Sequence, residues 1–128
     1  MKQLTESEAN ALIAEKVMGL KYAYPRFGKE FGRWQPVGAE PPVNGFKDPT
    51  ITLPDYLRSA EASKALRDAL AERWDTNLGS ANVAAFALWP KGTTDKLVPP
   101  THIATADTEY KAVALCALRS IGEDVDIV

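Results

Sequence analysis

The stretch "YKAVALCALRSIG", residues 110–122, is one of two capped helical patterns that bracket the chain. Its apolar residues recur at helical spacing and predict one face turned toward a core: Val113, Ala114, Ala117, Leu118 and Ile121. Asp107 or Thr108 is expected to cap the helix start, and Gly122 to end it in the left-handed conformation that glycine adopts readily. The predicted helix covers residues 108–121.

The second capped helical pattern is "NALIAEKVMGL", residues 10–20. Thr5 and Glu8 upstream have the spacing of a capping box, in which each side chain accepts a backbone N–H of the other residue. Gly19 is expected to end this helix, which we place at residues 5–18. A third helix is predicted over residues 59–74, with Ser59 as its cap and one face formed by Ala62, Ala65, Leu66, Ala69, Leu70 and Arg73.

Two strands are predicted between the second and third of these helices in chain order. Residues 83–89 alternate and are rich in apolar side chains, and Pro90 follows them. Residues 101–106 form the other candidate, so an antiparallel hairpin with a long, irregular connection is expected. The tail "EDVDIV" is short and acidic, and its carboxylates Glu123 and Asp124 are expected to be solvated. The expected fold is α+β: one domain, residues 1–128, with a small, mainly antiparallel sheet covered by about three helices.

Residues 21–54 have a different composition, with most of the proline, glycine and aromatic residues of the chain. Each proline removes a backbone donor and restricts the residue before it, so a regular helix is not expected here. The segment is predicted to be irregular, with short strands or an ordered loop around Tyr22 and Trp34 and at "TITL", residues 50–53. Its aromatic residues offer apolar area to bury, which argues against a disordered linker.

The bulk composition narrows the functional classes. The chain has 128 residues, of which 45% are hydrophobic and 25% charged, and its formal net charge is −2. This balance argues against broad nucleic-acid binding and against binding to anionic membranes. No apolar run approaches the ~20 residues of a membrane span. A single cysteine and the absence of a signal-peptide pattern favour a cytoplasmic location, in the host cell cytoplasm if the protein is phage-encoded.

Catalytic signatures are missing from the sequence. His102 is the only histidine, and no partner for a general base can be identified beside it. Cys116 lies among apolar residues of a helix, where a thiol keeps a high pKa and is inert. With one histidine and one cysteine, a histidine-cluster metal site is excluded, and no phosphate-loop or nucleophile-elbow motif occurs. We therefore expect no enzyme activity, no catalytic residue, no metal and no cofactor.

The strongest functional indication is "KYAYPRFGKEFGRW", residues 21–34, in which basic and aromatic residues alternate. Such a composition suits a protein interface, where tyrosine, tryptophan and arginine are frequent anchors. It also suits a nucleotide, because aromatic faces stack on bases and basic groups neutralise phosphate. A third interpretation is that the aromatics simply cover the sheet. The candidate binding residues are Tyr22, Tyr24, Arg26, Phe27, Lys29, Arg33 and Trp34, with Trp89 as a weaker exposed anchor.

Several sequence pieces, taken in order, resemble a known family. They are "LIAEKVMGL" at residues 12–20, a tryptophan and proline in the middle, "LPDY" before the second helix, and "ATADTEYKAVALCALRSIG" at residues 104–122. This order is similar to the phage α-β-α sandwich domain family, small proteins of phages and prophages, over nearly the whole chain. The resemblance implies an α/β sandwich and a phage origin, but no catalytic residues. The chain departs from the family pattern by a longer, more basic aromatic segment at residues 21–47.

These observations lead to two functional hypotheses. The first is a non-enzymatic phage or prophage accessory protein that binds a host or phage protein, as a homo-oligomer. The alternative is a protein that binds or sequesters a nucleotide-type small molecule and so acts against host defence. The first rests on the resemblance and on the missing catalytic chemistry, and the second rests on the basic aromatic segment.

Overall fold

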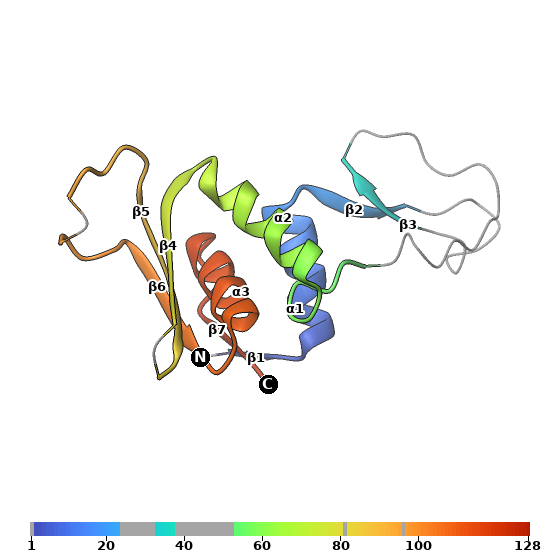
Figure 1. Ribbon diagram of the computed structural model, residues 1–128. Helices are drawn as coiled ribbons and strands as arrows, with labels where there is room; N and C mark the ends of the chain where they lie inside the picture. The colour runs from blue at the N-terminus through green and yellow to red at the C-terminus, as the bar shows by residue number, and fades with distance from the viewer. Residues whose placement is uncertain (1, 24–32, 38–52, 81, 96) are drawn as a thin grey trace.

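A computed structural model describes residues 2–23, 33–37, 53–80, 82–95 and 97–128 of the chain (Figure 1). The described residues form an α+β fold, as the sequence predicted. The helical elements are α1 (Glu6–Leu12), the π-helix η1 (Ile13–Val17), α2 (Ala60–Ala71) and α3 (Glu109–Ser120). The strands are β1 (Lys2–Leu4), β2 (Leu20–Ala23), β3 (Arg33–Pro36), β4 (Trp74–Ser80), β5 (Ala84–Pro90), β6 (His102–Ala106) and β7 (Val125–Ile127).

The helices begin at the capping residues that the sequence indicated. The Thr5 hydroxyl accepts a hydrogen bond from the backbone N–H of Glu8 at 3.1 Å, and the Glu8 carboxylate accepts one from the N–H of Thr5 at 3.2 Å. Ser59 caps α2 and Thr108 caps α3 in the same way, each by accepting an N–H of the first turn. These bonds satisfy backbone donors that have no partner within a helix.

Glycine ends two of the helical segments. Gly19 has φ +68° after η1, and Gly122 has φ +90° after α3, both in the left-handed region. The end of α2 differs from the prediction, because the helix stops at Ala71 instead of continuing to Trp74. Residues 74–80 then form β4, a strand that the sequence did not predict.

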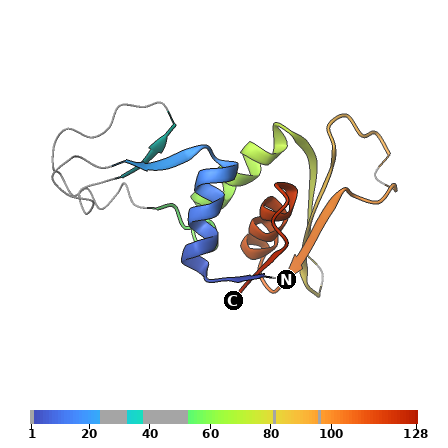
Figure 2. The same cartoon turned by 180° about the vertical axis from the view of Figure 1, so that it is seen from behind.

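The central sheet has the strand order β4-β5-β6, and both pairs are antiparallel. The predicted hairpin of residues 83–89 and 101–106 is confirmed as β5 and β6, with bounds shifted by one residue. Both views show the helices on one side of this sheet, with α3 next to it (Figures 1 and 2). Phe86, Leu88 and Ala104 on that face belong to the main core cluster. Ile103 points to the opposite face and is 52% exposed.

The chain ends meet in a short parallel pair of strands. β1 pairs with β7, in the register Lys2↔Val125 to Leu4↔Ile127. Asp124 is exposed as predicted, but the tail also carries core residues that the sequence did not indicate, because Val125 and Ile127 are buried in the core cluster. Successive side chains of a strand point to opposite faces. Val125 and Ile127 therefore point toward the core, and Asp126 between them points to the other face.

The β2–β3 hairpin lies on the other side of the helices from the central sheet (Figures 1 and 2). Its register pairs Leu20 with Pro36 and Tyr22 with Trp34, and the N–H of Val37 donates to the carbonyl of Gly19 at 3.0 Å. Of the two alternatives predicted around Tyr22 and Trp34, the structure forms strands. Residues 50–52 of the third predicted position, "TITL", lie outside the described residues. Each helix in the described part of the chain is too short or too polar to cross a membrane.

Candidate binding groove

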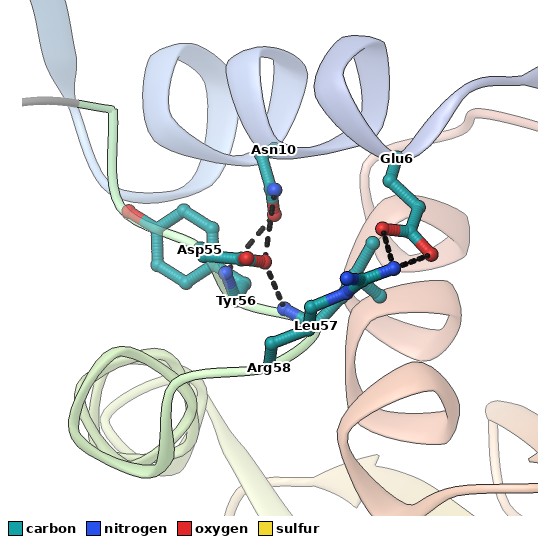
Figure 3. A network of polar contacts seen from close by, with 6 residues as sticks. All are labelled: Glu6, Asn10, Asp55, Tyr56, Leu57 and Arg58. Atoms are coloured by element: carbon teal, nitrogen blue, oxygen red, sulfur yellow. Dashed lines mark hydrogen bonds and ion pairs between the residues drawn. The ribbon is translucent and has the colours of Figure 1, made fainter.

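The segment before α2 is anchored to α1 through a buried amide. Asn10, on α1, accepts a hydrogen bond from the N–H of Tyr56 at 3.0 Å and donates one to Oδ1 of Asp55 at 3.2 Å. The same Asp55 oxygen accepts the N–H of Leu57 at 3.2 Å, which is the local bond of an Asx turn. Figure 3 shows these side chains converging between the two elements. The turn is thereby held in one position against α1.

An ion pair lies at the outer end of this network. A guanidinium nitrogen of Arg58 is 2.8 Å from one carboxylate oxygen of Glu6 and 3.0 Å from the other (Figure 3). Both side chains are well exposed to solvent. Ion pairs of this kind contribute little to folding because water screens the two charges. The buried bonds of Asn10 are therefore the part of the network that fixes the turn.

Tyr56 follows Asp55 and is fully buried, with 1% of its surface exposed. Burial raises the pKa of its hydroxyl from 10.0 to about 12, because desolvation disfavours the phenolate. The ring is therefore neutral near physiological pH. It provides apolar area at the bottom of the turn, beside the end of η1.

A groove of about 560 Å³ lies beside this anchored turn. Its walls come from three parts of the chain: the η1–β2 junction, the segment before α2, and the first two turns of α2. Most of the lining side chains are apolar. The lining residues are Met18, Leu20, Leu53, Pro54, Asp55, Tyr56, Ser59, Glu61, Ala62 and Ala65. The volume is within the range of sites that bind small ligands or a few side chains of a partner.

The charged groups among the described lining residues all have one sign. Asp55 and Glu61 are the two, and no lysine, arginine or histidine is among the described residues that line the groove. Glu61 is in the first turn of α2, where the helix dipole favours a carboxylate. An anionic ligand would have to approach these two carboxylates with no cation from the described lining beside them. The groove is therefore suited to an apolar or cationic ligand.

The groove reaches the β2–β3 hairpin at Leu20, which is one of its lining residues. Leu20 and Tyr22 are two residues apart on β2, so their side chains point to the same face. Trp34 faces Tyr22 across the hairpin, with ring centroids 5.9 Å apart and ring planes inclined by 53°. Tyr22 is 39% exposed, and Trp34 packs partly against the core. We call the groove together with Tyr22 and Trp34 the groove–hairpin surface.

The structure describes the side chains of only some of the residues predicted for binding. Tyr22 and Trp34 are brought together on the hairpin, and Arg33 pairs with Ala23 through the backbone. The side chains of Tyr24, Arg26, Phe27 and Lys29 lie outside the described residues.

Trp89 requires a correction, because the sequence suggested an exposed anchor. Its side chain is 5% exposed, and its indole N–H donates to the carbonyl of Val98 at 2.9 Å. The connection after β5 folds back over the outer side of the sheet and covers the indole. A proline and a polar turn after Trp89 suggested exposure, but they only mark the end of the strand.

The two residues considered for chemistry have structural surroundings. His102 is on β6, with its ring edge-on to Trp74 at a centroid distance of 5.3 Å. Cys116 is completely buried in α3, and burial raises the pKa of its thiol to about 12. In the part of the chain that the structure describes, no three His, Cys, Asp or Glu residues gather as a metal site would require.

The sequence reasoning missed Asn10, Asp55 and Glu61. The pattern "LPDYLRS", residues 53–59, does contain a local signal, because an aspartate followed by a serine cap favours a turn before a helix. Nothing local indicates that Asn10 holds this turn, since 45 residues separate it from Asp55. Comparisons with family models, curated proteins and solved structures find no match to this chain.

Proposed function

We propose that the protein is a non-enzymatic phage or prophage accessory protein that binds a host or phage protein through the groove–hairpin surface. The observation that carries the proposal is an apolar groove of about 560 Å³ lined by Leu20, which shares one face of β2 with Tyr22 and so with the Tyr22–Trp34 pair. Tyrosine and tryptophan are favoured anchors because they bury a large area with few rotatable bonds. The anchored turn at Asp55 keeps one wall of the groove in place before a partner arrives, which lowers the entropic cost of binding.

A nucleotide is less well supported at this surface. The carboxylates of Asp55 and Glu61 would repel a phosphate, and no cationic side chain among the described lining residues offsets them. The nucleotide hypothesis depends on Arg26, Lys29 and Arg33, whose side chains are not among those described. It stays a prediction of the sequence, as does the homo-oligomer.

Affinity capture with matched variants tests the proposal. The immobilised protein is exposed to a lysate of the host cell, alongside its Tyr22→Ala and Leu97→Ala variants. Leu97 is a suitable control because it is 94% exposed and lies outside the groove–hairpin surface. We expect a partner that the wild type and Leu97→Ala both retain and that Tyr22→Ala loses by about tenfold or more, as an aromatic anchor would.

Two results would contradict this function. One is a set of captured proteins that is the same for all three baits, because the aromatic pair would then have no part in recognition. The other is turnover by the purified protein in nuclease or nucleotidase assays that is lost when a single acidic residue is replaced. That result would establish catalysis in place of binding alone.

A further inference from the structure

We infer that the groove binds a partner segment that presents a lysine or arginine next to an apolar side chain. This inference rests on the proposed function and specifies the chemistry of the partner. Two features of the groove lead to it. Its apolar floor includes Met18, Leu20 and Tyr56, and the charged residues of its described lining are Asp55 and Glu61.

The two carboxylates are available to a ligand. Oδ1 of Asp55 already accepts hydrogen bonds from Asn10 and Leu57, but Oδ2 accepts none from the residues that the structure describes. Glu61 is exposed and forms neither an ion pair nor a side-chain hydrogen bond within the same described residues. Two nearby basic residues are engaged with other carboxylates, Arg58 with Glu6 and Lys64 with Asp68.

A basic residue would satisfy both features at once. The aliphatic stem of lysine or arginine packs on apolar surface while its charged end reaches an acceptor. An apolar neighbour in the same segment would bury its side chain against the floor of the groove. An acidic or phosphorylated segment would instead place like charges together in a partly desolvated site, which is unfavourable. The apolar floor alone would bind apolar segments of any charge equally well. The two carboxylates therefore make the groove prefer the segments that also carry a basic residue.

Selection from a displayed library of random peptides tests this chemistry directly on the intact protein. Peptides retained by the wild type are sequenced, then synthesised with a fluorophore and titrated by anisotropy. We expect enriched peptides to carry lysine or arginine beside an aliphatic or aromatic residue. Replacing that basic residue by glutamine should weaken binding, and added salt should do the same because it screens the attraction.

Neutral variants of the groove provide the decisive measurement. Glu61→Gln should weaken peptide binding by about threefold to fivefold, as the loss of one partly exposed ion pair would. Asp55→Asn keeps an oxygen that accepts the N–H of Leu57 and should weaken binding similarly, with thermal unfolding measured to show that the turn persists. Glu109→Gln is the matched control, because Glu109 is the equivalent first-turn carboxylate of α3 and does not line the groove. It should bind peptides like the wild type.

The outcomes separate this inference from the proposed function. If peptides are enriched that Tyr22→Ala no longer binds, but they lack basic residues or bind equally to Glu61→Gln and Asp55→Asn, the inference is wrong and the proposed function stands. If enriched peptides depend on Glu61 and Asp55 but bind Tyr22→Ala as tightly as the wild type, the inference stands and the role of the hairpin in the proposed function is wrong. If no peptide is enriched, or if every enriched peptide binds Tyr22→Ala, Glu61→Gln and Asp55→Asn as tightly as the wild type, both are wrong.

Discussion

Replacing Asn10 by alanine should remove the bond between α1 and the turn before α2. The substitution deletes the acceptor of the Tyr56 N–H at 3.0 Å and the donor to Asp55 at 3.2 Å. Asn10 is 7% exposed and Tyr56 1% exposed, so water cannot readily replace the lost partner. The N–H of Tyr56 would then be left buried without a hydrogen bond.

The size of the effect follows from three contributions. Each lost hydrogen bond has a net value of about 0.5–1.5 kcal/mol, which gives about 1–3 kcal/mol for the pair. The unsatisfied N–H of Tyr56 places the result in the upper half of that range. Alanine has a higher helix propensity than asparagine, which offsets about 0.5 kcal/mol. We therefore expect the free energy of unfolding to fall by about 2 kcal/mol, and the melting temperature by roughly 6–10 °C.

Urea unfolding followed by tryptophan fluorescence and by circular dichroism measures this change. Ser7→Ala is the control for helix propensity, because Ser7 is exposed on the same helix and makes no contact with the turn. It should be as stable as the wild type or slightly more so. An Asn10→Ala protein that unfolds at the same urea concentration as Ser7→Ala would refute the idea that the buried amide holds the turn.

Two further predictions concern the core. Ile127→Ala should lower the free energy of unfolding by about 2–5 kcal/mol because it leaves a cavity beside β1. Val128→Ala is the control and should have little effect, because Val128 is 64% exposed. Urea unfolding of the two variants side by side measures the difference. Stability should also decline as the pH rises from about 9 toward 12. Burial raises the pKa of Cys116 from 9.0 and the pKa of Tyr56 from 10.0, each to about 12, so both groups stay protonated in the folded protein. Their contribution to stability is therefore full below the unfolded pKa values and is lost as the pH rises from these values through the folded ones. Urea midpoints at neutral pH and at about pH 10.5 should differ less for Cys116→Ala than for the wild type, and equal losses in both would contradict the assignment.

Helix starts, and the two helix ends marked by glycine, were the most predictable part of this protein. The capping box of Thr5 and Glu8 joins residues three apart, and Ser59 and Thr108 cap α2 and α3 through bonds of the same range. Gly19 and Gly122 end helical segments because of a backbone conformation that glycine adopts without strain. These interactions are local, so the sequence around each of them was sufficient.

The missed strands depended on partners far away in the sequence. β4, "WDTNLGS", contains aspartate, asparagine and glycine, which are weak strand formers, and it becomes a strand because β5 pairs with all seven of its residues. β1 and β7 have three residues each and lie at opposite ends of the chain. Neither has enough length for a periodic pattern, so only their mutual pairing defines them.

The sequence by itself determined the α+β class, the three helices with their caps, the central hairpin and the aromatic character of the β2–β3 region. Tertiary structure alone decided the groove, the burial of Trp89 under the chain that follows it, and the joining of Asn10 to Asp55 across 45 residues. The physical reason is the separation in sequence between the residues that interact. Caps and periodic faces depend on residues within one or two turns, whereas a binding surface needs side chains from separate segments to meet, and only the packed chain brings them together.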